Sequence, residues 1–203
     1  MNEKTNWRKE INIGIIALCV TIVGIYIDKN WPGDGLPLPQ PPLKFKIDYL
    51  YRHKHQFEFK PLTNTATLKS CDLYKIIFTP LEKSYVYIFQ TDSKSNNIIQ
   101  IFPMYKFKGV ILNHSNPVMA ETTYHIPKKN ISFILDNNSG TTETIYFIAA
   151  REPDIELEQL YKEIKIAQQH DEIIQSKLET SKILQKITQN KTIGEQQYII
   201  KNS

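Results

Sequence analysis

The hydrophobic pattern of the chain changes twice along its length. Residues 11–27 (INIGIIALCVTIVGIYI) form one apolar run without a charged side chain. Beyond Leu43 apolar residues mostly alternate with polar ones, and after Pro153 they recur at spacings of three and four. An unbroken run predicts a membrane span, alternation predicts β-strands, and the longer spacing predicts α-helix. The pattern therefore predicts one N-terminal transmembrane helix, a mainly β domain and a long C-terminal α-helix.

These changes of pattern divide the chain into segments. They are a cytoplasmic tail (1–10), a transmembrane helix (11–27), a proline-rich linker (28–43), a β-sandwich-like domain (44–152), a C-terminal helix (153–193) and a tail (194–203).

The apolar run is long enough to reach across a bilayer. At about 1.5 Å per residue it covers roughly 25 Å of a hydrocarbon core that is about 30 Å thick. Trp7 and Trp31 flank it, as aromatic residues do at membrane interfaces. A buried core helix is the alternative, but a domain of this size seldom surrounds a helix on all sides. The residues predicted to anchor the chain in lipid are Ile11, Ile15, Ile16, Leu18, Val20, Ile22, Val23, Ile25 and Ile27.

Basic residues predict the direction of insertion. Lys4, Arg8 and Lys9 precede the run, whereas Lys29 is the only basic residue soon after it. Positive charge is retained on the cytoplasmic side of a membrane. The N-terminus is therefore expected in the cytoplasm, at an inner or plasma membrane, with the rest in the periplasm or outside the cell. Prolines in 32–42 predict a semi-rigid polyproline II spacer, and a PxxP-type ligand is the alternative for that stretch.

Alternating segments between turn-forming residues predict an antiparallel β-sandwich. The expected strands are Lys44–Tyr51, Gln56–Lys60, Leu73–Thr79, Tyr85–Thr91, Ile98–Phe102, Thr122–Ile126, Ile131–Leu135 and Thr142–Ala149. The fourth strand carries apolar residues on both faces, so it is expected at the centre of a sheet. Turn-forming clusters at 92–97 and 136–140 predict hairpins between the strands that flank them.

The C-terminal segment is predicted to be one continuous helix. Asp154 can cap its N-terminus, and Gly194 can end it. Its apolar stripe, interrupted at Asp171, is expected to pack on the sheet over the first three turns. A helix of about 38 residues would extend for about 57 Å, farther than a small domain is wide. The distal half is therefore predicted to offer a partner-binding face made of Ile174, Leu178, Leu184 and Ile187.

Several short motifs, taken together, resemble a known bacterial family. They are Tyr85–Asp92 (YVYIFQTD), Ile101-Phe102-Pro103, Asn116-Pro117-Val118, Ile126-Pro127, Phe133–Asp136, Gly140–Tyr146 and Ala149–Pro153. In order and spacing this set is similar to the domain of unknown function 4384 family, over roughly residues 70–158. The resemblance implies a β-rich accessory module, found in kinase-like, caspase-like and envelope-protein contexts, and it brings no catalytic residue. Cys71 stands where the family usually has glycine.

Two charged residues of the resembling stretch stand near apolar strands. Arg151 and Glu143 are expected to pair with each other or with Asp136, because buried charges are usually paired.

The remaining chemistry of the sequence is sparse. The net charge of +4 comes from dispersed lysines, and nucleic-acid binding is not expected. His53 and His55 share a strand face and could bind a metal with a third ligand, but Arg52 and Lys54 interleave them, and a solvated basic strand is the favoured interpretation. No nucleophile motif or glycine-rich phosphate loop is present. The sequence thus predicts no enzyme, cofactor or metal.

These expectations combine into a functional hypothesis. The chain is predicted to be a membrane-anchored, extracytoplasmic binding or assembly protein with a protein partner, a subunit of a cell-envelope complex such as a secretion or surface-assembly machine. The alternative is an extracytoplasmic sensory module that binds a small molecule or peptide.

Overall fold

A computed structural model describes residues 41–94, 97–135, 141–169, 173–189 and 196–202. The predicted anchor (11–27), its orientation and most of the linker lie outside these residues. Among the helices of the described part, none combines the length and the apolar character needed to cross a membrane.

The described chain is mainly β, followed by helices. Its strands are β1 (Phe45–Arg52), β2 (Lys60–Pro61), β3 (Ala66–Leu68), β4 (Leu73–Pro80), β5 (Tyr85–Asp92), β6 (Ile98–Phe102), β7 (Lys106–Phe107), β8 (Val110–Ile111), β9 (Tyr124–Ile126), β10 (Phe133–Ile134), β11 (Thr142–Ala150) and β12 (Gln196–Asn202). The helices α1 (Ile155–Gln169) and α2 (Ile173–Gln189) stand between β11 and β12.

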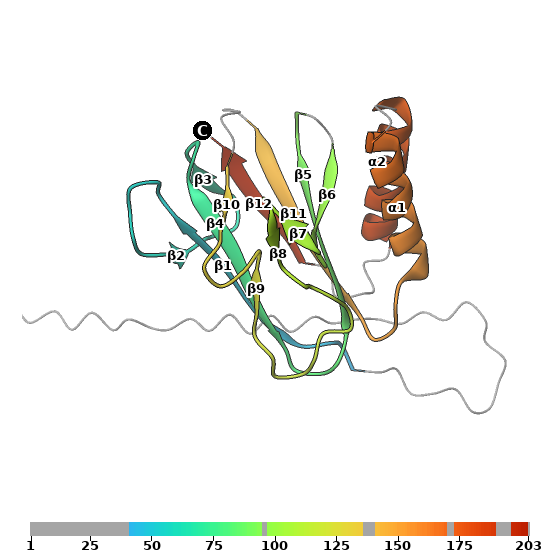
Figure 1. The fold of residues 1–203 in the computed structure, drawn as a ribbon, viewed down its shortest axis with the longest axis horizontal. Helices are drawn as coiled ribbons and strands as arrows, with labels where there is room; N and C mark the ends of the chain where they lie inside the picture. Colours follow the sequence, from blue (N-terminus) through green and yellow to red (C-terminus); the bar gives the residue numbers. More distant parts are fainter. Residues whose placement is uncertain (1–40, 95–96, 136–140, 170–172, 190–195, 203) are drawn as a thin grey trace, which may run out of the picture.

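Two sheets form the body of the domain. Sheet A has the order β10-β4-β1-β2, with β9 also paired to β4, and sheet B has the order β3-β12-β11-β5-β6. Pairing is antiparallel except between β12 and β3. Figure 1 shows the helices at one side of the molecule, beside β5 and β6, and β1 and β4 on the opposite side. The predicted antiparallel, mainly β architecture is confirmed.

Alternation of side chains along the strands builds a core between the sheets. On β4, Tyr74, Ile76 and Phe78 are buried, whereas the residues between them are half-buried on the outer face of sheet A. The rings of Phe78 and Phe147 meet edge to face at 5.3 Å, which joins the two sheets. Such aromatic pairs contribute about 0.5–1.5 kcal/mol beyond the area that they bury.

A second core covers the outer face of sheet B. Tyr87 and Phe89 of β5 point away from the inter-sheet core and pack with Leu157, Ile164 and Ile183 of the helices. Val86 and Ile88 of β5 face the inter-sheet core instead. Both predictions, that β5 is covered on two faces and that the first turns of the helical segment pack on the sheet, are confirmed.

The helical segment is two helices instead of the single long one predicted. The helices α1 and α2 pack against each other, and Ile183 and Ile187 of α2 share a core with α1. The stripe that a single helix would have left open is therefore buried in part by folding back. The predicted tail also contains β12, which lies between β11 and β3.

One of the two predicted hairpins is wrong. The 92–97 cluster does join the antiparallel neighbours β5 and β6. The 136–140 cluster instead connects β10 of sheet A with β11 of sheet B. The reason is that Phe133 of β10 packs on Tyr74, with ring centroids 5.2 Å apart, so this short strand pairs with β4.

The predicted pairing of Arg151 with Glu143 is wrong, and the alternative partner Asp136 lies outside the described residues. Arg151 binds Glu82 through Nε and Nη2, at 3.2 and 3.0 Å, and donates to the carbonyl of Pro41. Glu143 is buried between the sheets and accepts a hydrogen bond from Gln90 at 2.9 Å. Glu143 is the second residue of β11 and Arg151 follows its last residue, so the length of the strand keeps the two charges apart.

Candidate binding surface

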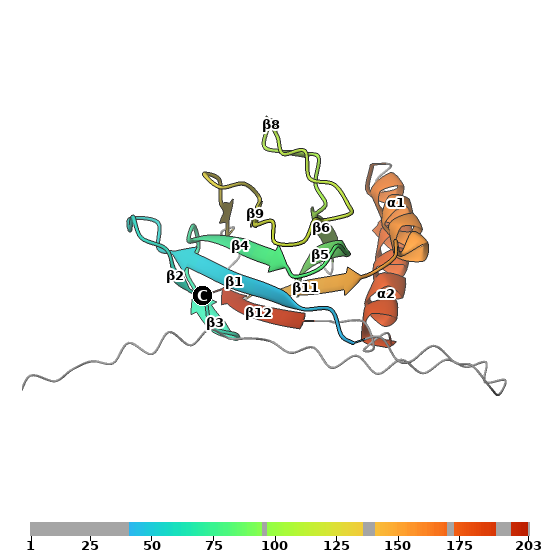
Figure 2. The same cartoon turned by 90° about the horizontal axis from the view of Figure 1, so that it is seen from below.

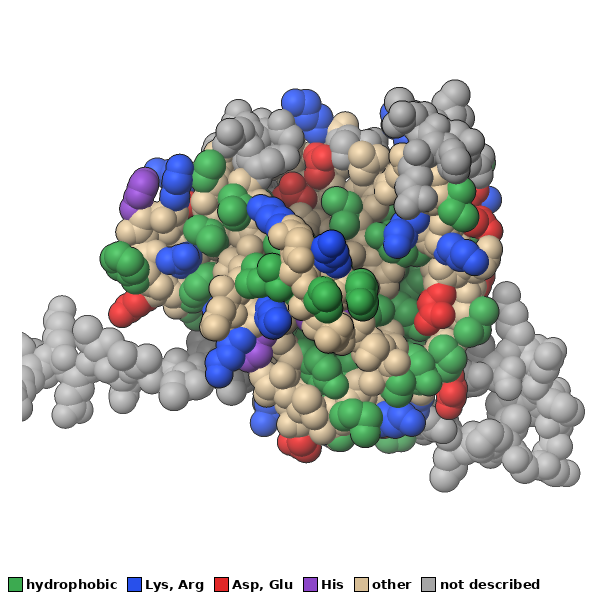
Figure 3. Space-filling view, in the orientation of Figure 1, with side chains coloured by type: hydrophobic (Ala, Val, Ile, Leu, Met, Phe, Trp, Pro, Cys, Tyr) green, Lys and Arg blue, Asp and Glu red, His purple; other side chains and the backbone are tan. Residues whose placement is uncertain are grey.

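One stretch of the domain is rich in exposed apolar and basic residues and poor in acids. Between residues 93 and 135 the sequence contains five lysines, and Glu121 is its single acid. Six of the eleven large hydrophobic residues that the described part of the chain exposes lie in this stretch: Ile99, Tyr105, Val110, Ile111, Met119 and Ile134. Figure 3 shows basic and hydrophobic side chains interspersed on the face where β7, β8 and β9 lie nearest the viewer. This face therefore combines exposed apolar side chains with an excess of positive charge.

The basic side chains next to this stretch come together through strand register. Lys75 lies on the outer face of β4, and Phe59 lies beneath its ammonium group, at 4.0 Å from Nζ to the ring centroid. The guanidinium of Arg52 lies 5.3 Å from the same ring. His125 of β9 is paired with Ile77, the next outward-facing residue of β4. We call Arg52, Phe59, Lys75, His125 and Lys129 the sheet patch.

Burial and positive charges within the sheet patch lower the pKa values of Lys75 and His125. Burial and the charge of Arg52 lower the pKa of Lys75. Burial, with the charges of Lys75 and Lys129, lowers the pKa of His125. No ion pair within the described residues includes a member of the sheet patch. Asp48, exposed on β1 opposite Ile77, is an acid of the same sheet face. With three permanent cations and one nearby acid, the patch keeps a net positive charge.

A two-stranded hairpin projects beside this patch. The strands β7 and β8 are joined by Lys108 and Gly109, which have φ values of 45° and 84°. Positive φ at both central residues is the requirement of a type I′ turn, which suits a two-residue hairpin. Figure 2 shows β8 at the end of a loop that extends away from the two sheets. We call Tyr105, Lys106, Lys108, Val110 and Ile111 the hairpin patch.

The hairpin is held at its base and exposed at its tip. Phe107 packs edge to face on Phe133, with ring centroids 5.2 Å apart, and Lys128 donates to the carbonyl of Ile111 at 3.4 Å. Tyr105 is 68% exposed, and Ile111 is 50% exposed. The anchored hairpin thus exposes Tyr105 and Ile111 near its open end and Lys108 at its turn.

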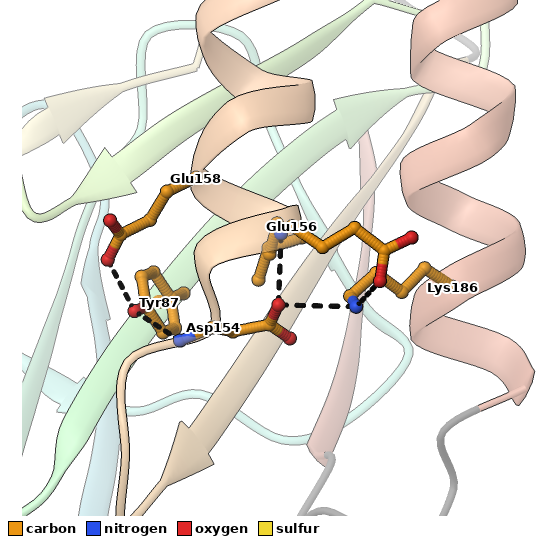
Figure 4. A network of polar contacts seen from close by, with 6 residues as sticks. Tyr87, Asp154, Glu156, Glu158 and Lys186 are labelled. Atoms are coloured by element: carbon orange, nitrogen blue, oxygen red, sulfur yellow. Dashed lines mark hydrogen bonds and ion pairs between the residues drawn. The ribbon is translucent and has the colours of Figure 1, made fainter.

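Polar contacts on the opposite side of the domain fix the helices to sheet B. Figure 4 shows that the hydroxyl of Tyr87 donates to Glu158 and accepts from the amide of Asp154, at 2.6 and 3.1 Å. Lys186 of α2 binds Asp154 at 3.2 Å, and it also binds Glu156. Burial and the bond to Glu158 raise the pKa of Tyr87. Burial opposes the charge of Lys186, but its bonds to Glu156 and Asp154 outweigh that effect and raise its pKa. This network attaches both helices to sheet B.

The residues of the predicted partner-binding helix face divide between the core and the surface. Ile187 is 3% exposed, and half-buried Leu184 packs in the same cluster on sheet B. Leu178 is 52% exposed. The side chain of Ile174 and all the anchor residues lie outside what the structure describes. The structure therefore brings Leu184 and Ile187 together and leaves Leu178 apart.

The two histidines singled out as metal ligands have different surroundings. His53 Nδ1 lies 2.8 Å from the carboxylate of buried Asp72, which also accepts from the amides of Lys54 and Lys69. His55 is exposed. No group of three potential metal ligands occurs among the described residues. Neighbouring Cys71 has φ 70°, a conformation that favours glycine and explains the family's preference there.

The sheet patch is absent from the sequence predictions. Its members are separated by up to 77 positions, from Arg52 to Lys129, and only the pairing of β4 with β1 and β9 brings them together. The usable signal was the acid-poor stretch 93–135, combined with the alternation that places Lys75 on the outer face of β4.

The fold defines a two-sheet β domain with a pair of helices on one outer face. Residues 73–153, from β4 to the turn before α1, match the family model of the domain of unknown function DUF4384. This match confirms the resemblance found in the sequence; β1, both helices and β12 lie outside it. Neither the curated proteins nor the solved structures give a match.

Proposed function

We propose that the chain is a membrane-anchored, extracytoplasmic, non-enzymatic binding and assembly protein, a subunit of a cell-envelope complex such as a secretion or surface-assembly machine. Residues 11–27 supply the anchor, the proline-rich linker holds the domain away from the bilayer, and the open face of sheet A binds a protein partner.

The sheet patch is the observation that carries this proposal. Lys75 and Arg52 share one aromatic ring, and the described residues offer them no ion pair. Placing cations side by side has a cost that an acidic partner would remove. The outer face of sheet B does not compete for this role, because the helices already cover it.

Affinity purification of the full chain from its native membranes in a neutral detergent tests the proposal. We expect a protein to co-purify with the wild type and to be lost with Lys75→Glu/Lys129→Glu, because reversing two charges turns attraction into repulsion. The matched control is Lys162→Glu/Lys165→Glu, the same charge change at exposed positions on α1. It should retain the partner.

Two results would overturn the proposal. One is a monodisperse monomer without any bound protein in the extract. The other is a chain that alkaline carbonate releases from the membrane, since a spanning segment resists this treatment.

A further inference from the structure

We propose that the β7–β8 hairpin docks on the surface of an anionic lipid bilayer and so orients the tethered domain. This inference rests on the membrane attachment in the proposed function. It assigns the hairpin patch a ligand different from the protein partner of the sheet patch.

The composition of the hairpin fits an interfacial contact. Tyr105, Val110 and Ile111 are exposed, and the exposed Lys106 and Lys108 lie between Tyr105 and Val110 in the same short segment. Tyrosine prefers the headgroup level, and lysine can extend its ammonium toward phosphates while its stem remains in apolar surroundings. No acid occurs within this segment or within nine residues on either side of Tyr105–Ile111. The lysines of the hairpin would therefore be attracted to an anionic surface without repulsion from nearby acids.

The shape of the hairpin favours lipid over an acidic protein. A stable protein interface buries about 800 Å² on each partner, across a broad and well-packed surface. The hairpin has two residues in each strand and projects from the body of the domain (Figure 2). A narrow convex tip can enter the interfacial region of a bilayer, as the apolar residues of amphipathic surface elements do. The proposed anchor tethers the domain to a membrane, which would raise the effective concentration of bilayer for the hairpin.

An environment-sensitive fluorophore at the tip can test this contact. The full chain, with Cys19→Ser and Cys71→Ser, carries an NBD label through Ile111→Cys and is reconstituted in nanodiscs. The discs contain phosphatidylcholine alone or a mixture with phosphatidylglycerol. A second preparation carries the label through Lys165→Cys on the exposed side of α1.

We expect the label at 111 to shift its emission to the blue and to be quenched by doxyl lipids in the anionic discs. The label at 165 should report water in both lipids. Lys106→Gln/Lys108→Gln should lower the ratio of docked to free hairpin by about fivefold per lysine, the factor for a basic residue at an anionic surface. Lys162→Gln/Lys177→Gln, which removes the same charge from exposed helix positions, should leave the ratio unchanged.

Several outcomes would overturn the inference. Equal emission from position 111 in both lipids would do so, as would quenching that survives loss of Lys106 and Lys108. A label that stays in water while Lys106→Gln/Lys108→Gln loses a co-purifying protein would assign the hairpin to an acidic protein instead. In a chain that resists alkaline extraction these results refute the lipid contact alone, whereas a chain that is extracted refutes the proposed function.

Discussion

The outer faces of the two sheets differ in how far their polar and charged groups are paired within the described chain. On sheet B, the helices cover Tyr87 and Phe89, and the hydroxyl of Tyr87 both donates and accepts a hydrogen bond. On sheet A, Lys75 and Arg52 share a phenyl ring and have no ion pair among the described residues. A face whose polar groups are satisfied within the chain stabilises the fold. A face that keeps an uncompensated charge is available for binding.

The largest expected effect comes from a matched pair of apolar substitutions. Ile164 on the covered face is 0% exposed, and Ile134 at the edge of sheet A is 50% exposed. Ile164→Ala should lower the free energy of unfolding by about 2–5 kcal/mol, because it leaves a cavity between the helices and sheet B. Ile134→Ala should cost less than about 1 kcal/mol, since a half-exposed side chain leaves no closed cavity. Denaturant unfolding of the full chain in neutral detergent measures both, and equal losses would contradict the contrast between the faces.

A smaller effect is expected from removing one tyrosine hydroxyl, that of Tyr87 under the helices. Tyr87→Phe removes a donor to Glu158 and an acceptor for the amide of Asp154. Unfolding free energy should fall by about 1 kcal/mol, the usual net value of a buried hydrogen bond, and by more if the amide stays unpaired.

Tyr105→Phe is the control for that hydroxyl, because Tyr105 is an exposed residue of the hairpin patch. Its change should stay within about 0.5 kcal/mol. Thermal unfolding of both variants in the same detergent gives the comparison, and a Tyr87→Phe protein as stable as Tyr105→Phe would show that the network in Figure 4 does not fix the helices.

The sequence predicted those features of the fold that depend on the local alternation of apolar and polar residues. Alternation alone located β4, β5 and β11, and it showed that β5 would be covered on both faces. The polar turn at 136–140 indicated that the chain reverses, but nothing local says which sheet the next strand joins. The strand β12 pairs with β3 and β11 from far along the chain, so its short segment could not be recognised in isolation. Asp171 was the local sign that the helical stripe does not continue.

The sheet patch could not be predicted from the sequence for a similar reason. Arg52, Lys75 and Lys129 each look like ordinary surface cations in the sequence, and the acid-poor stretch around Lys129 does not show that the three lie together. Their joint field arises only when β9 and β1 pair on either side of β4. The hairpin patch, in contrast, is continuous in sequence, and its lack of acids and its two lysines among apolar residues are visible there, although the exposure of those residues is not.

The smallest expected effect comes from removing the charge of Lys75 on the outer face of sheet A. Lys75→Gln should change the free energy of unfolding by less than about 1 kcal/mol at neutral pH, because the loss of the cation–π contact with Phe59 is offset in part by relief of the repulsion from Arg52. The same change should raise the pKa of His125, since the charge of Lys75 is one of the causes that lower it. NMR titration of the histidine ring protons measures this shift, with His55 as the exposed reference.

The direction of the stability change with pH follows from that pKa. Burial and the nearby lysines hold the folded-state pKa of His125 below its ordinary value of 6.5, so the unfolded chain takes up the proton first as pH falls. Stability from this site is therefore complete above pH of about 6.5 and declines as the pH drops toward the folded-state pKa. Lys75→Gln should make the decline between pH 7 and pH 5 shallower, whereas Lys165→Gln on α1 should leave it unchanged. Parallel declines in wild type and Lys75→Gln would mean that solvent screens the patch, and the open face would then lack the field that its proposed partner is attracted by.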